Sequence, residues 1–150
     1  YRVGDATRPI GAGNKIIAHC CNNRGAWGAG FVLALSRRWP QPQACYEEWA
    51  RQSRPGHMPL GDVQFVDVAA GLVVANIIGQ TLGAEFPPIN YDALARGLAR
   101  VAAEAIARGA SVHAPRLGCG LAGGSWEKVS AILELEIGAR GIHVTIYDLE

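Results

Sequence analysis

Two glycine-rich stretches have residue types and spacing that could support chemistry, and each begins where an apolar strand pattern ends. They are residues 22–30 (NNRGAWGAG) and residues 115–126 (PRLGCGLAGGSW), the second with four glycines. Glycine removes side chains where a backbone must approach a ligand closely. A turn that opens onto a helix start also presents unpaired N–H groups at the positive end of the helix dipole, which suits a phosphate. Two such turns predict a ligand with two linked phosphates, although each could also be an ordinary tight turn.

The histidines and cysteines provide no recognisable metal or nucleophile motif. The sequence has no C-x-x-C or H-x-x-x-H pair, so we expect no metal and no cofactor. His19 and His113 lie on strand patterns, where a hydrogen-bonded core histidine is the common outcome. Cys119 lies near a helix start, where a thiolate can be stabilised. Its glycine neighbours favour instead a small residue in a tight turn.

A regular alternation of strand and helix patterns surrounds the two turns. We predict strands over 15–21, 62–68, 72–78, 111–115 and 143–147, and helices over 30–39, 43–51, 91–108 and 126–140. The second and third strands should form a hairpin. The alternation predicts a single three-layer α/β domain over residues 1–150, with a mixed, largely parallel sheet. In such sheets ligands bind at the carboxyl ends of the strands, where both glycine turns lie.

Individual residues indicate where the helices begin, end and face the core. Asn90 and Ser125 have the residue types of N-caps, and Gly109 is typical of a residue that ends a helix. In the 43–51 helix, Cys45 and Trp49 are predicted to face inward.

The composition limits the classes of protein to which the chain can belong. An apolar content of 49% with 18% charged residues is typical of a packed domain and argues against disorder. The net charge of +1 gives no general attraction for nucleic acid or an anionic membrane. Arg37, Arg38, Arg51 and Arg54 could form a local basic patch, but the interpretation we favour is that they belong to a solvent-exposed helix face. No apolar run approaches the roughly 20 residues that cross a bilayer. The four cysteines lack the spacing of a disulfide framework in a secreted protein, so we expect the reducing cytoplasm as the compartment.

Three stretches of the chain resemble the macrodomain family, the ADP-ribose-binding α/β module. They are residues 4–7 (GDAT), 19–31 (HCCNNRGAWGAGF) and 115–126 (PRLGCGLAGGSW). The resemblance covers nearly the whole chain. It is greatest to the branch that contains the terminal ADP-ribose protein glycohydrolase and the yeast ADP-ribose-1″-phosphate phosphatase. It implies a three-layer α/β/α fold with ADP-ribose as the ligand.

The resemblance also implies which residues contact that ligand. Asp5 would accept a hydrogen bond from the adenine amino group, and the second glycine turn would hold the diphosphate. The first glycine turn would surround the second phosphate and the distal ribose. The implied ligand-binding residues are Asp5, Ala6, Gly28, Ala29, Gly30, Phe31, Gly118, Cys119, Gly120, Leu121, Ala122, Tyr147, Asp148 and Leu149. The candidates for positioning the ribose and a water molecule are Asn22, Asn23 and Trp27.

Several of these residues also have a purely structural interpretation. Asp5 could form an Asx turn after a strand, and Tyr147 could belong to the core. Either asparagine could serve the turn, with Asn22 preferred to Asn23 as the ribose contact. Trp27 could cover the distal ribose or pack its turn onto the domain.

Two arginines flank the glycine turns. Arg24 and Arg116 could form a basic rim for a nucleic-acid substrate. Arg116 could equally act as a structural hydrogen-bond donor.

The chain departs from the glycohydrolase pattern at both of its catalytic positions. Ala122 stands where the resemblance implies an aspartate, and residues 77–80 (IIGQ) lack the implied lysine. The only lysines are Lys15 and Lys128, so a lysine nucleophile is excluded. A positioned water could still attack the anomeric carbon of the distal ribose. This route needs a leaving group that departs without a proton, such as a carboxylate.

We therefore expect an enzyme that hydrolyses mono-ADP-ribose from glutamate and aspartate side chains without a Lys/Asp pair. The alternatives are a non-catalytic ADP-ribose reader and a hydrolase of ADP-ribose-1″-phosphate or ADP-ribosylated DNA. The expected partners are ADP-ribose and mono-ADP-ribosylated proteins, with ADP-ribosylated nucleic acid open. We expect no membrane association, and a monomer.

Overall fold

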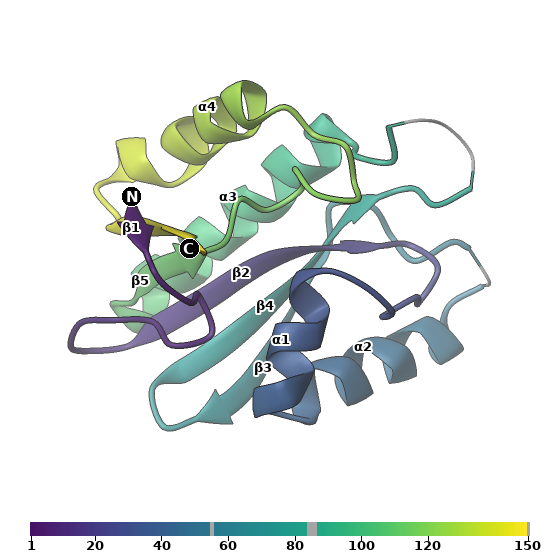
Figure 1. Ribbon diagram of the computed structural model, residues 1–150, viewed down its shortest axis with the longest axis horizontal. Coiled ribbons are helices and arrows are strands. Elements are labelled where there is room, and N and C mark those ends of the chain that lie inside the picture. The colour runs from purple at the N-terminus through teal and green to yellow at the C-terminus, as the bar shows by residue number, and fades with distance from the viewer. Residues whose placement is uncertain (55, 84–86, 150) are drawn as a thin grey trace.

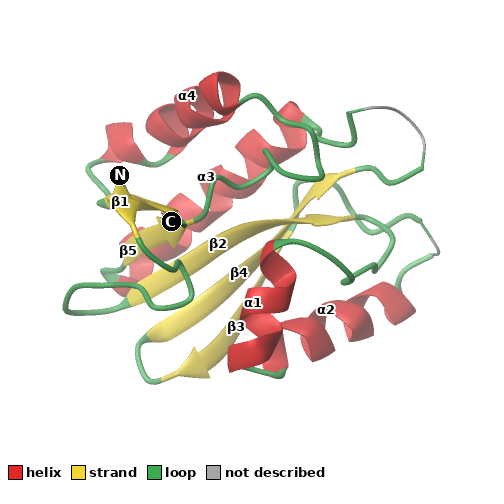
Figure 2. Ribbon diagram, in the orientation of Figure 1, coloured by secondary structure: helices red, strands yellow, loops and turns green. Residues whose placement is uncertain are grey.

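The computed structural model describes residues 1–54, 56–83 and 87–149, and its centre is a six-stranded sheet (Figures 1 and 2). The strands are β1 (Arg2–Val3), β2 (Lys15–Asn22), β3 (Val63–Ala69), β4 (Leu72–Gln80), β5 (Ser111–Ala114) and β6 (Val144–Asp148). Their order is β1-β6-β5-β2-β4-β3. Every neighbouring pair is parallel except the β3–β4 hairpin, which is antiparallel. The predicted mixed, largely parallel sheet is confirmed.

Helices cover both faces of the sheet and complete the three layers. They are α1 (Phe31–Arg38), α2 (Gln41–Gln52), α3 (Tyr91–Arg108) and α4 (Trp126–Glu136), with a short 3₁₀ helix at Gly138–Arg140. Ile16 and Ala18 of β2 pack in the cluster that includes α3 and α4, whereas Ile17 packs in the cluster that includes α1 and α2. Successive side chains of a strand point to opposite faces, so β2 is buried on both sides. This burial explains its continuous apolar run.

The loops that follow the parallel strands all lie at one edge of the sheet. The two glycine turns follow β2 and β5, which are hydrogen-bonded neighbours. Asp5 follows β1, the outer strand beyond β6. The predicted location of both glycine turns at the carboxyl ends of parallel strands is therefore confirmed.

Three local predictions need correction. Strand β4 continues to Gln80, where we expected the loop to begin at residue 79. The last α-helix ends at Glu136 and not at residue 140, because Gly138 favours the helix weakly and begins a separate 3₁₀ turn. In α2 the fully buried side chain is Tyr46, which was not predicted; Trp49 packs against the core as expected but is only partly buried, and Cys45 is also only partly buried. Among the described residues, no helix has the length and apolar character needed to span a membrane.

The two predicted helix caps differ in a way that can be tested by mutation. Asn90 Oδ1 accepts a hydrogen bond of 2.9 Å from the Ala93 amide, whereas the Ser125 side chain makes no capping bond. Asn90→Ala should therefore lower the free energy of unfolding by about 1 kcal/mol. Ser125→Ala, the matched control, should change it by less than about 0.5 kcal/mol. Urea unfolding followed by circular dichroism measures both; equal losses would contradict this assignment of the caps.

Candidate functional site

Two adjoining cavities lie at the carboxyl edge of the sheet, between the glycine turns. The first cavity has a volume of about 180 Å³ and the second about 260 Å³. The first is lined by His19, Cys20, Ala29, Gly30, Phe31, Val32, Gln80, Pro115, Arg116, Leu117, Gly118, Gly120, Leu121 and Ala122. The second is lined by Cys20, Cys21, Asn22, Ala26, Gly28, Ala29, Val32, Gln80, Leu82, Pro88 and Leu121. The shared residues make the two cavities one continuous site.

The second glycine turn is closed by its own backbone. The amide of Gly124 donates to the Gly118 carbonyl over 2.8 Å, and a Cβ on Gly124 would collide with that carbonyl oxygen. Gly118 has a φ of +75°, a conformation that other residues rarely adopt. These two positions require glycine because of the shape of the turn.

Several residues of the same turn that line the first cavity have unpaired backbone amides. In the described part of the chain, the amides of Gly118, Gly120, Leu121 and Ala122 have no backbone or side-chain acceptor. All four residues line the first cavity. Unpaired amides in a glycine-rich turn form a concave anion site.

The start of α1 forms the facing wall of the first cavity. Gly30 is its N-cap and provides no capping side chain, and both Phe31 and Val32 line the cavity. Neither of their amides has an acceptor among residues 1–54, 56–83 and 87–149. A helix N-terminus adds the positive end of its dipole. The first cavity therefore has the donors and the polarity to bind a phosphate between the two turns.

Asn22 holds the first glycine turn in shape. Its Oδ1 accepts from the amides of Arg24 and Ala26 at 2.9 and 3.2 Å, and its Nδ2 donates to the Ala26 carbonyl at 2.7 Å. The Tyr46 hydroxyl lies 2.6 Å from the Asn22 carbonyl oxygen and accepts from the Gly25 amide. Asn22 thus has the turn role considered from the sequence, but it also lines the second cavity.

Asn23 and Trp27 lie outside the linings of both cavities. Asn23 donates to the Gly56 carbonyl and accepts from the Leu82 amide, so it joins two loops. Trp27 is only 7% exposed, and its Nε1 donates to Ser36 Oγ over 2.7 Å. Its ring packs edge-on against His19. The indole of Trp27 therefore packs the turn onto the domain, which is the structural alternative considered from the sequence.

Asp5 forms the Asx turn that was the structural alternative. Its Oδ1 accepts from both the amide and the hydroxyl of Thr7, each at 2.8 Å. Burial acts to raise the pKa of this carboxyl, but the Thr7 hydrogen bonds and nearby Arg38 lower it below its ordinary value. Asp5 is therefore ionised at neutral pH. It lines a third cavity, separate from the first two, while the adjacent Ala6 is buried.

The residues at the end of β6 have mainly structural contacts. Tyr147 is buried, and its hydroxyl lies 2.7 Å from His113 Nδ1 and accepts from the Ile10 amide. Asp148 forms a two-point ion pair with Arg116, at 2.6 and 3.0 Å. Leu149 is 81% exposed. Tyr147 therefore belongs to the core, and Arg116 has the structural donor role.

The histidine and cysteine side chains at the site are kept uncharged. Burial lowers the pKa of His19 to about 4, and its Nε2 donates to Asn76 Oδ1 at 2.5 Å. Burial raises the pKa of Cys20 to about 12 and also raises that of Cys119. A reactive thiolate is thereby disfavoured. The described residues contain no cluster of three or more side chains that could hold a metal ion.

Gln80 is a candidate functional residue that the sequence pattern did not reveal. It pairs with Asn22 across the β2–β4 ladder, lines both cavities and donates from Nε2 to the Cys20 carbonyl at 3.3 Å. Since we expected the loop to start at residue 79, nothing placed this side chain at the sheet edge. Neither cavity has a carboxylate or lysine among its described lining residues.

Tyr46 provides a test of how the first turn is held. Tyr46→Phe removes the hydroxyl that bonds both Asn22 and Gly25, and should lower the free energy of unfolding by about 1–3 kcal/mol because buried groups lose their partner. The control is Tyr91→Phe, which loses one exposed bond from the Ser125 amide and should cost less than about 1 kcal/mol. Denaturant unfolding measures both variants. A Tyr46→Phe variant no less stable than the control would refute this role.

Comparison with known proteins places the geometry in context. No family model matches the sequence. The solved structure of a macrodomain protein from Streptomyces coelicolor is 49% identical, with a TM-score of 0.88, over 99% of this chain and 97% of that one. The mouse chromodomain-helicase-DNA-binding protein 1-like is 30% identical over 98% of this chain. The chain spans only 17% of that relative's length.

A shorter similarity involves a named phosphatase. The ADP-ribose 1″-phosphate phosphatase of Candida albicans is 34% identical over 55 residues, which is 35% of this chain and 35% of that protein.

Proposed function

Since this chain belongs to the macrodomain family, we propose that it binds ADP-ribose along the carboxyl edge of its sheet. One observation carries the proposal. Residues of the second glycine turn and of the α1 start, whose backbone amides are unpaired, line the same first cavity. These donors suit the diphosphate, since backbone N–H groups and a helix dipole favour anionic oxygens.

The two remaining parts of ADP-ribose would then extend in opposite directions. The distal ribose would occupy the second cavity, beside Asn22, Gly28 and Gln80. The adenosine half would extend toward Asp5, whose carboxylate can accept from the adenine amino group through the oxygen that Thr7 does not use.

In this orientation we propose that the protein hydrolyses ADP-ribose esters of glutamate and aspartate side chains. A water molecule attacks the anomeric carbon of the distal ribose, and the bond to the carboxylate oxygen breaks. The carboxylate leaves as an anion, and the proton of the water passes to solvent. Gln80 Oε1 would accept a hydrogen bond from this water, because its amide nitrogen is already held by Cys20. Positioning of this kind can lower a barrier substantially.

The residues that line the cavities support a substrate in which ADP-ribose is attached to a glutamate or aspartate carboxylate. Without a carboxylate or lysine among their described lining residues, the cavities provide no strong acid to protonate a leaving group. A carboxylate with an ordinary pKa near ~4 needs no such proton. A serine alkoxide or an arginine guanidine would need one.

Two other functions are supported by specific observations. The same lack of acid and nucleophile in the cavities supports a reader that binds ADP-ribose without turnover. The similarity to the Candida albicans protein supports ADP-ribose 1″-phosphate as a substrate, since phosphate is also a leaving group that departs as an anion.

Release of free ADP-ribose from defined substrates tests the proposal. Protein carrying glutamate-linked mono-ADP-ribose should be turned over, while serine- and arginine-linked substrates should not. Gln80→Leu should slow release by about tenfold or more because the water loses its acceptor. Lys128→Ala, on the surface of α4, should leave the rate unchanged.

A heat-denatured sample is the control for spontaneous ester hydrolysis. Faster release from serine or arginine would contradict the proposed chemistry. Binding of ADP-ribose without release from glutamate would indicate a reader.

A further inference from the structure

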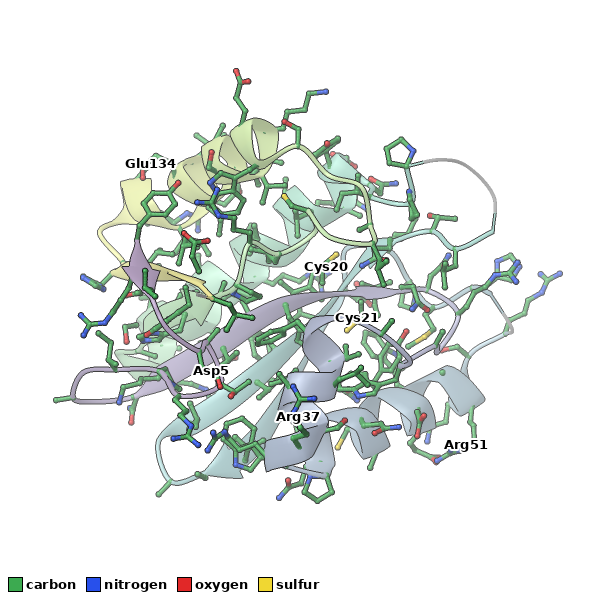
Figure 3. The ribbon with its side chains drawn as sticks, in the orientation of Figure 1. Asp5, Cys20, Cys21, Arg37, Arg51 and Glu134 are labelled. Atoms are coloured by element: carbon green, nitrogen blue, oxygen red, sulfur yellow. The ribbon has the colours of Figure 1, made fainter. Side chains whose placement is uncertain are left out.

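A third cavity, which we call the arginine cleft, lies between the loop after β1 and the last turns of α1. It has a volume of about 500 Å³ and is lined by Asp5, Thr7, Arg8, Ala34, Arg37 and Arg38. In Figure 3, Asp5 lies close to α1, the helix that carries Arg37. We propose that this cleft is a second phosphate subsite, which takes a phosphate monoester on the adenosine ribose of the bound nucleotide. The inference rests on the proposed binding of ADP-ribose.

The charges in the arginine cleft are not neutralised within the protein. Arg8, Arg37 and Arg38 form no salt bridge with any described carboxylate. The arginines that do form such bridges are Arg51, Arg96, Arg100, Arg108 and Arg116. The lining therefore combines three arginines with a single carboxylate, and the cleft has a net positive charge that an anionic ligand could balance.

Part of the cleft is fixed in position before any ligand arrives. Arg38 Nε donates to Thr7 Oγ1 over 3.2 Å, and the Thr7 hydroxyl donates to Asp5 Oδ1 over 2.8 Å. Thr7 is only 2% exposed, and the Arg38 guanidinium also lies 5.8 Å from the centre of the Trp39 ring. The Arg38 terminal nitrogens have no acceptor in the described residues. A guanidinium fixed through Nε presents these nitrogens to a phosphate with little further loss of side-chain freedom.

The cleft lies at a suitable distance from the proposed diphosphate site. Both use α1, since Phe31 at its start lines the first cavity, while Ala34, Arg37 and Arg38 line the cleft. At 1.5 Å per residue, Arg37 lies about 9 Å along the helix axis from Phe31. With the diphosphate in the first cavity and the adenine at Asp5, the adenosine ribose would lie between them. A phosphate on that ribose would then reach the arginines.

The sequence pattern had favoured a solvent-exposed helix face for Arg37 and Arg38, together with Arg51 and Arg54. The structure separates these residues. Arg51 lies on α2 in an exposed ion pair with Glu48. Arg37 and Arg38 instead line a cleft together with Thr7, whose hydroxyl donates a hydrogen bond to the Asp5 carboxylate. Arg51 and Arg54 are therefore suitable controls for the loss of positive charge alone.

Calorimetric titration with ADP-ribose and with ADP-ribose 2′-phosphate tests the inference. The wild-type protein should bind the 2′-phosphate about tenfold more tightly, as expected for hydrogen bonds to a charged group. Arg8→Gln/Arg37→Gln should reduce this preference while leaving the affinity for ADP-ribose within about threefold. Both side chains are exposed, and neither makes a hydrogen bond within the described chain, so the variant should fold. Arg51→Gln/Arg54→Gln removes the same charge elsewhere and should retain the preference.

The possible outcomes separate this inference from the proposed function. Equal or weaker binding of the 2′-phosphate by the wild-type protein overturns the subsite, even if ADP-ribose binds well. A preference that is undiminished in Arg8→Gln/Arg37→Gln, or that is reduced equally in the control, also overturns it. Failure of both nucleotides to bind would overturn the proposed ADP-ribose site, and the subsite with it.

Discussion

The parallel pairing of β2 with β5 is the constraint on which the rest of the site depends. The ladder aligns Lys15 with Ser111 and Ile17 with His113, so the two strands run side by side in the same direction. Their carboxyl ends, and the glycine turns that follow them, must therefore lie at the same edge of the sheet. An antiparallel pairing would place the turns at opposite ends and separate the two walls of the first cavity. The burial of β2 on both faces stabilises this pairing.

The side chains around the cavities mostly hold the backbone in place. Asn22 and Tyr46 fix the first turn, Trp27 packs beneath it, and His19 is neutral and bonded to Asn76. In the proposed function, backbone amides therefore bind the anion, and these groups do not ionise in the physiological pH range. A site of this kind offers little acid, base or nucleophile of its own. Under the proposed function, the substrate's leaving group and a bound water must provide the chemistry.

Local sequence signals were sufficient for most of the fold. Apolar runs located every strand except the short, exposed β1. Asn90 and Gly109 marked both ends of α3, because capping is a local interaction. The glycine turns were also found, since positive φ and close backbone approach demand glycine at Gly118 and Gly124. These features depend on neighbours within a few residues.

Contacts between distant parts of the chain could not be predicted in the same way. The hydroxyl of Tyr46 reaches Asn22, Arg116 pairs with Asp148, and Gln80 joins the site only because β4 continues beside β2. None of these partners is adjacent in sequence. Even so, structural contacts that the sequence offered as alternatives are present, including the packing of Trp27 and the Asx turn at Asp5.

Under the proposed function, unpaired amides of two loops bind the diphosphate of ADP-ribose. Amide chemical shifts of ¹⁵N-labelled protein, recorded during titration with ADP-ribose and separately with adenosine, test it most directly. The amides of Phe31, Val32, Gly118, Gly120 and Leu121 should shift with ADP-ribose and remain unchanged with adenosine, which lacks the diphosphate. If these amides stayed unperturbed while ADP-ribose bound elsewhere, or if adenosine shifted them equally, the account of the site would be wrong.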